Sequence, residues 1–143
     1  MLDALIIAAH PDDAEIGMGG TILRMLEDDL KVGILDLTNG EPTPLGTPEI
    51  RIRETKAASE MLGVTWRNNL GLPNRKLQHD LAARAALAGI IRKTQPRWLF
   101  THYWVDAHPD HVAACELTEA ARFWSKLTKC ELPFSPHFPE RVF

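Results

Sequence analysis

The apolar stretch ALIIAA, residues 4–9, is followed directly by HPDDAE, residues 10–15, and this junction sets the architecture of the chain. An apolar run of this length and β-branched content is typical of a strand buried on both faces of a parallel sheet. A second such run, VGILDL at 32–37, comes after residues 20–30, whose apolar side chains recur at helical spacing. The order strand, helix, strand predicts a right-handed crossover unit.

The rest of the chain continues this alternation. A helix beginning at Pro48 has Thr47 as its expected N-cap and Gly63 after its end. The further helices are expected at residues 48–62, 81–93 and 109–123. The further strands are expected at residues 64–68, 98–101 and from RVF at 141–143 onward. The alternation predicts an α/β fold, a Rossmann-like parallel sheet with helices on both faces.

Composition places the chain among ordinary globular proteins. It has 143 residues, 45% hydrophobic and 24% charged, which suits a single domain, 1–143. The formal net charge of -3 and the mixing of acids with bases predict no nucleic-acid or membrane partner. The cysteines, Cys115 and Cys130, form no CxxC pair, which argues against a thiolate zinc site. The apolar run 4–9 is too short for a signal peptide, so we expect a cytoplasmic protein.

The loop after the first strand carries a motif suited to a cation. In an open parallel sheet, ligands bind beyond the carboxyl ends of the strands, where strand order reverses. A nucleotide-binding loop would place glycine immediately after the strand, whereas this loop offers His10 and the carboxylates of Asp12, Asp13 and Glu15. These carboxylates would repel a phosphate, so a nucleotide-binding module is the less favoured alternative.

A catalytic zinc takes three ligands from His and Asp or Glu and keeps a fourth position open for water. His10, one carboxylate and one later histidine would supply that set. Pro11 stiffens the turn, and residues three apart in a tight turn can face the same side. This favours Asp13 over Asp12 as the ligand, although spacing alone leaves the choice open.

The second motif is HPDH, residues 108–111, shortly after the expected strand at 98–101. His108 and His111 lie three apart at a helix start, so both can point into one cavity, and one of them suffices as a ligand. The other, with Asp110 as an orienting partner, could stabilise charge on a reacting carbonyl oxygen. Taken alone, HPDH would suit capping or surface histidines; together with the first motif it indicates a metal site.

Four stretches carry a resemblance to a known family: AHPDDAEIGMGGT at 9–21, GTPEIRIRE at 46–54, NLGLP at 69–73 and DAHPDH at 106–111. In combination they resemble the PIG-L/LmbE-like zinc-dependent N-deacetylases. The likeness is greatest to the bacillithiol-biosynthesis branch, the N-acetylglucosaminyl-malate deacetylases. The resemblance implies hydrolysis of the N-acetyl group of an N-acetylglucosaminyl small molecule, which releases acetate and a free amine.

The resemblance also implies roles for single residues. Asp12 would act as general base and then general acid. His108 would polarise the acetyl carbonyl, with Asp110 behind it. The residues implied to bind Zn²⁺ are His10, Asp13 and His111.

An arginine in an RxxE helix contacts the substrate in this family, and Arg51 with Glu54 matches that spacing. The alternative for this pair is an exposed i,i+3 ion pair worth about 0.2–0.5 kcal/mol. His102 lies near the motifs without a motif partner, and we expect a hydrogen-bonded structural role for it. The chain departs from the family pattern at Asn39 and Asn74, and these departures bear on the identity of the substrate rather than on the metal site.

Family members continue beyond a point like Phe143, so we expect the domain to be incomplete at its C-terminus. A second hypothesis follows, in which the chain is a zinc-binding but inactive truncated fragment or assembly module of the same fold. The resemblance further implies a homo-oligomer, in particular a hexamer.

Overall fold

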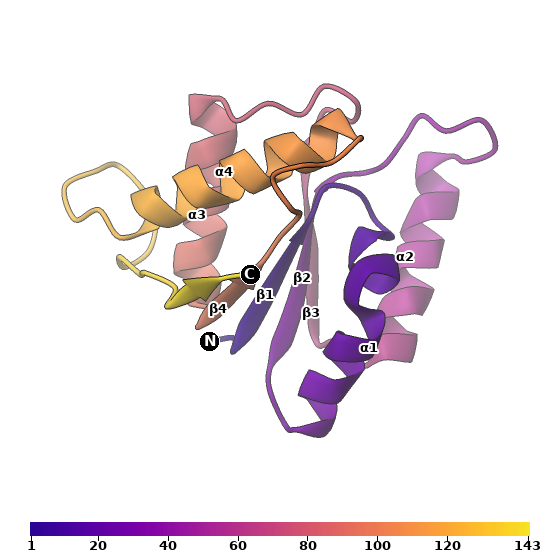
Figure 1. The fold of residues 1–143 in the computed structure, drawn as a ribbon, viewed down its shortest axis with the longest axis horizontal. Coiled ribbons are helices and arrows are strands. Elements are labelled where there is room, and N and C mark those ends of the chain that lie inside the picture. Colours follow the sequence, from indigo (N-terminus) through magenta and orange to yellow (C-terminus); the bar gives the residue numbers. More distant parts are fainter.

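The computed structural model describes residues 1–143 and contains a five-stranded parallel sheet with four helices (Figure 1). The strands are β1 (Ala4–Ala8), β2 (Val32–Thr38), β3 (Trp66–Leu72), β4 (Trp98–Phe100) and β5 (Arg141–Val142). The helices are α1 (Asp13–Glu27), α2 (Pro48–Leu62), α3 (Leu81–Thr94) and α4 (Pro109–Ser125). The spatial order β3-β2-β1-β4-β5 is that of a doubly wound fold, which confirms the expected Rossmann-like architecture.

The helices cover both faces of the sheet. Figure 1 shows α1 and α2 on one side of the strands and α3 and α4 on the other. Because side chains alternate along a strand, β1 supplies both cores: Leu5 and Ile7 pack in the cluster that contains α3 and α4 residues. Ile6 packs with Ile34 and with α1 residues such as Ile22. The central strand is therefore buried on both faces, and its carboxyl end is held firmly.

Strand order reverses between β1 and β4, which are hydrogen-bonded neighbours. The chain runs from β1 outward to β2 and β3, then crosses to β4 on the other side of β1. The loops that leave β1 and β4 therefore start side by side. This is the place where open α/β sheets bind ligands.

The first helix begins earlier than its apolar pattern indicated. The periodic residues start near Gly20, whereas α1 begins at Asp13. Met18 has non-helical dihedral angles (φ −149°, ψ 23°), so a kink divides the helix. The predicted start corresponds to the part after the kink, and the part before it carries the carboxylates of the first motif.

The third strand also differs from its predicted extent, because β3 runs from Trp66 to Leu72 rather than over residues 64–68. It is an edge strand of the sheet, and Arg67, Asn68 and Asn69 separate its apolar residues, so it has no apolar run to mark its end. The Asn69 side chain donates to the Thr38 carbonyl at 2.7 Å and extends the pairing with β2.

The ends of α2 form as expected. The Thr47 hydroxyl accepts a hydrogen bond from the Ile50 backbone, and Gly63 ends the helix in the left-handed region at φ 79°.

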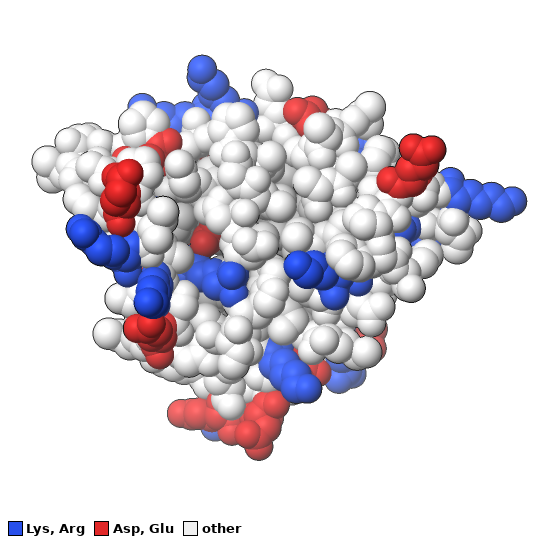
Figure 2. Space-filling view, turned by 180° about the vertical axis from the view of Figure 1, so that it is seen from behind, with Lys and Arg blue, Asp and Glu red and all other residues white.

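No helix in the fold combines the length and the apolar character that a bilayer crossing requires. Figure 2 shows cationic and anionic side chains interspersed on the face behind the view of Figure 1.

Candidate metal centre

The loop after β1 folds into a tight turn that aims Asp13 back at His10. The backbone N–H groups of Asp12 and Asp13 donate to the His10 carbonyl at 3.0 and 3.3 Å. The His10 N–H in turn donates to Asp13 Oδ2 at 2.8 Å. Pro11 lies within this turn, and α1 starts at Asp13, where the helix dipole favours a carboxylate.

The second motif lies at the start of α4. His108 is the N-cap residue, and its Nδ1 accepts a hydrogen bond from the Asp110 N–H at 3.1 Å. Pro109 occupies the first helical position, where its missing N–H costs nothing. Because Nδ1 is an acceptor, a neutral His108 ring carries its proton on Nε2 and can donate it outward.

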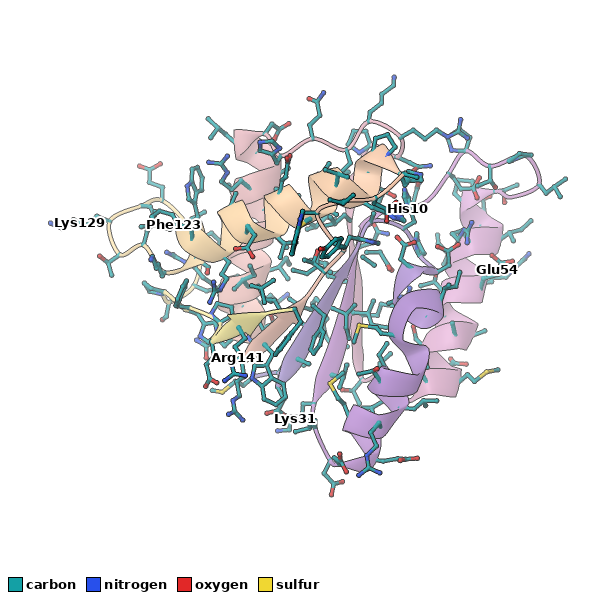
Figure 3. All side chains as sticks on the ribbon, in the orientation of Figure 1. His10, Lys31, Glu54, Phe123, Lys129 and Arg141 are labelled. Carbon is teal, nitrogen blue, oxygen red and sulfur yellow. The ribbon has the colours of Figure 1, made fainter.

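The two loops meet on one carboxylate. His10 Nδ1 lies 3.2 Å from Asp13 Oδ2, and His111 Nε2 lies 3.4 Å from Asp13 Oδ1. The ring centroids of His10 and His111 are 5.4 Å apart. Figure 3 places His10 beyond the carboxyl end of the sheet, next to the first turn of α4. Residues a hundred positions apart in sequence thus face a common point.

These three residues fit a zinc ion. One ligand atom from each of His10, Asp13 and His111 lies within 4.8 Å of the others. Zinc bonds to His and carboxylate are about 2.0–2.2 Å long, so tetrahedral ligand atoms lie about 3.3–3.6 Å apart. The separations of His10 Nδ1 from Asp13 Oδ2 and of His111 Nε2 from Asp13 Oδ1, 3.2 and 3.4 Å, are close to that span. Two imidazoles and a carboxylate are also a ligand set that leaves a position open for water.

A second group of possible ligands is His10, His108 and Asp110. The Asp110 oxygens, however, already accept backbone N–H groups from Arg75 at 2.7 Å and Leu77 at 3.1 Å. Both oxygens of Asp110 are thus engaged, whereas Asp13 accepts a backbone N–H only at Oδ2 and has Oδ1 toward His111, which makes Asp13 the better candidate for a ligand. The set with Asp13 is therefore the one that the geometry favours.

The electrostatics separate the two neighbouring aspartates. Burial alone would raise the pKa of Asp13, but its contacts with the imidazoles of His10 and His102 hold that pKa well below its usual range. Burial and the charge of Asp13 raise the pKa of Asp12, and Arg51 acts in the opposite direction. One carboxylate is thus kept ionised, as a ligand must be, while the other is shifted toward the range of a general base.

Asp110 does not lie behind His108 as the resemblance implied. Its Oδ2 contacts His10 Nε2 at 3.1 Å, and its only bond to His108 runs through the backbone N–H. The cause is the N-cap: His108 turns its Nδ1 back onto the helix, so Asp110 is left to reach His10. Burial opposes ionisation of Asp110, but its bonds to His10, Arg75 and Leu77 lower its pKa.

Arg51 reaches the same place from α2. Its Nη1 donates to the Pro11 carbonyl at 3.1 Å and contacts Asp12 Oδ2 at 3.3 Å. It also lies 3.8 Å from Glu41 Oε1, whereas the exposed Glu54 makes no ion pair with it. The alternative of a simple i,i+3 surface pair for Arg51 is therefore wrong.

Sequence reasoning gave no role at this site to two side chains, Asp106 and Glu41. Asp106 contacts His111 Nδ1 at 3.0 Å, and Glu41 lies beside Arg51. His102 accepts the Ala9 N–H at 3.0 Å and stacks on His111, consistent with the expected hydrogen-bonded role. The stretch DAHPDH did include Asp106, but nothing in its spacing showed which histidine it would contact.

Gly40 lets the loop after β2 approach the first motif. It adopts φ 71°, and a Cβ there would lie 3.1 Å from Pro11 Cδ. We expect Gly40→Ala to lower the free energy of unfolding by about 1–2 kcal/mol, because the left-handed region is strained for alanine. It should also weaken zinc binding, because the new methyl group presses on the His10 turn.

Gly63→Ala is the matched control for this prediction. Gly63 also has a positive φ, 79°, but a Cβ there meets no atom within 4 Å. Urea unfolding and zinc titration of both variants separate strain from contact. Equal zinc affinity in the two variants would contradict a role for Gly40 in shaping the site.

Comparison with known proteins gives consistent matches. Residues 5–122 match the profile of the PIG-L family, described as GlcNAc-PI de-N-acetylase. Diacetylchitobiose deacetylase of Thermococcus kodakarensis is 32% identical over 120 residues, which are 75% of this chain and 44% of that protein. The 1D-myo-inositol 2-acetamido-2-deoxy-alpha-D-glucopyranoside deacetylase of Actinosynnema mirum is 29% identical, covering 82% of this chain and 53% of its own length.

Among solved structures, the conserved protein TT1542 from Thermus thermophilus superposes with a TM-score of 0.96 and 44% identity. The match covers 99% of this chain and 64% of that one. The chain thus spans about half the length of the curated relatives that it matches.

Proposed function

We propose that this chain, which belongs to the PIG-L family, removes the acetyl group from the nitrogen of an N-acetylglucosamine-type small molecule in a zinc-dependent hydrolysis. The observation that carries the proposal is the meeting of His10 and His111 on the two oxygens of Asp13, at 3.2 and 3.4 Å. Both curated relatives named above are deacetylases, and their names specify acetylated amino sugars.

The roles of the chain's own groups follow from their positions. A zinc ion held by His10, Asp13 and His111 would act as a Lewis acid toward the acetamide and its attacking water. Asp12, on the adjacent turn and with a raised pKa, accepts a proton from that water. The same carboxyl group then protonates the departing amine.

His108 stabilises the developing charge on the carbonyl oxygen. Its Nδ1 is engaged by the Asp110 N–H, so its Nε2–H is the group free to donate. One such donor is commonly worth about 3–4 kcal/mol in the transition state. Asp110 acts indirectly, because it contacts His10 and orients that ring.

A cavity in the structure is a candidate pocket for the part of the substrate that lies beyond its N-acetylglucosaminyl group. A cavity of about 390 Å³ opens between α2 and the ends of β2 and β3, and Asn39, Arg51 and Lys56 are among its lining residues. Its cationic side chains, which are Arg51, Lys56 and Arg67, suit a group that bears carboxylates. Among N-acetylglucosaminyl conjugates we therefore place N-acetylglucosaminyl-malate, of bacillithiol biosynthesis, first.

The test is a panel of acetylated substrates incubated with the zinc-loaded chain. Release of free amine is followed for N-acetylglucosaminyl-malate, an N-acetylglucosaminyl-inositol and diacetylchitobiose. We expect release, with the malate conjugate fastest. Faster release from a neutral conjugate would contradict the assignment of the cationic pocket to a carboxylate-bearing group.

The second candidate is a zinc-binding chain without turnover. It is favoured by the length comparison, because this chain corresponds to only part of each relative. Bound zinc together with no amine release from any compound would support it and contradict the deacetylase proposal for this chain.

A further inference from the structure

The His111 ring has a carboxylate partner at each nitrogen and lies against two other histidine rings. Its Nε2 faces Asp13, while its Nδ1 lies 3.0 Å from Asp106 Oδ2. The rings of His102 and His108 stack against it, with centroids 4.0 and 4.7 Å away and planes inclined by 15° and 20°. Stacking fixes the plane of an imidazole, but it does not determine which nitrogen points which way.

The contact with Asp106 supplies the missing constraint. Both nitrogens of His111 face carboxylates, which can only accept, but a cation held between Nε2 and Asp13 requires the lone pair of Nε2. The proton of a neutral His111 is then on Nδ1, where Asp106 accepts it. The Nε2 lone pair is then directed at Asp13, where a cation would lie. Asp106 is itself fixed, because its Oδ1 accepts the His108 N–H at 2.7 Å.

The arrangement repeats at the other histidine. His10 presents Nδ1 to Asp13 and Nε2 to Asp110 Oδ2, at 3.2 and 3.1 Å. Each imidazole therefore has one nitrogen on the shared carboxylate and the other on a carboxylate of its own. Asp110 is buried and held by backbone N–H groups, whereas the Asp106 side chain is 33% exposed and sits in the loop before α4.

We propose that Asp106 is a positioning residue for the metal centre, which holds His111 as the Nδ1–H tautomer with its Nε2 lone pair toward the cation. Partners of this kind fix the orientation of metal-binding histidines, and their loss typically weakens metal binding about 10- to 100-fold. The inference rests on the proposed metal site but concerns a residue to which that proposal gives no role.

Asp106→Asn is the informative substitution, because asparagine has nearly the same shape. If its Oδ1 keeps the bond to the His108 N–H, an NH₂ group replaces the Oδ2 that faced His111. A donor at that position favours the opposite tautomer and turns the protonated nitrogen toward Asp13. We therefore expect zinc affinity to fall about 10- to 100-fold.

The control is a histidine–carboxylate pair outside the site. His79 Nδ1 lies 2.9 Å from Glu116 Oε2 on the surface, so Glu116→Gln makes the same chemical change elsewhere. Zinc affinity of both variants and the wild-type chain is measured by competition with a chromophoric chelator. Nitrogen-15 NMR of the metal-free proteins reports the His111 tautomer, which a merely structural role of Asp106 would not reverse.

The outcomes are distinct. Weaker zinc binding and a reversed tautomer in Asp106→Asn, with Glu116→Gln unchanged, support the proposal. Wild-type affinity and an unchanged tautomer in Asp106→Asn overturn it while leaving the metal site intact. Absence of zinc binding in the wild-type chain would overturn the metal site itself. Asp106→Ala, checked by circular dichroism, provides a second variant with the same expected loss of affinity.

Discussion

Asp12→Asn is expected to lower kcat/KM for amine release about 10²- to 10⁴-fold. The amide cannot accept the proton of the attacking water, whereas the Asp12 carboxylate, with its raised pKa, can. The change keeps the shape of the side chain, and His10, Asp13 and His111 are untouched. Zinc content should therefore stay at the wild-type level while turnover is lost.

The control for Asp12→Asn is another aspartate paired with an arginine. The exposed Asp28 follows the end of α1, and its Oδ1 lies 2.8 Å from Arg24 Nη2, so Asp28→Asn removes the same charge far from the motifs. The measurement is steady-state amine release, with zinc quantified in the same samples. An Asp12→Asn variant that keeps its zinc and most of its activity would contradict the role of Asp12 as the base.

Arg67→Met is expected to lower the free energy of unfolding by about 3–5 kcal/mol. Arg67 on β3 binds both oxygens of Asp36 on β2, at 2.9 and 3.0 Å, and Glu15 on α1 at 2.5 Å. The side chains of Arg67 and Asp36 are only 8% and 2% exposed. Removing the cation would leave a buried carboxylate without compensation, next to a second negative charge.

The loss in free energy of unfolding caused by Arg67→Met should also depend on pH. Burial raises the pKa of Asp36 even though Arg67 opposes the shift. Without Arg67 the folded state binds a proton more readily than the unfolded chain, so stability is lost as pH rises and recovered as pH falls.

Urea unfolding at several pH values measures the effect of Arg67→Met. Arg53→Met, on the exposed side of α2, is the control and should change stability by no more than about 0.5 kcal/mol. A loss in Arg67→Met no larger than that of the control would contradict a structural role for the network.

The centre of the fold could be predicted because its strands are buried on both faces. The runs at 4–9 and 32–37 became β1 and β2 with bounds shifted by one residue at most. The edge strand β3 was predicted too short, since the polar residues 67–69 interrupt its apolar residues. The early start of α1 was missed because carboxylates and glycines interrupt the apolar pattern on both sides of the kink at Met18.

The meeting of the two motifs could be predicted from topology alone, since both loops leave the carboxyl ends of neighbouring strands. The partners of single side chains could not. Asp110 contacts His10 because the N-cap turns His108 back onto α4, a matter of side-chain direction. The network of Arg67 joins three elements, and no spacing in the sequence indicates it.

Zinc titration of the purified chain tests the central claim most directly. We predict one zinc ion bound per wild-type chain and greatly weakened binding in His10→Ala and in His111→Ala. His79→Ala, which changes a surface histidine paired with Glu116, should bind zinc as the wild type does. A wild-type chain that binds no zinc, or His10→Ala and His111→Ala variants that bind it equally well, would contradict the account.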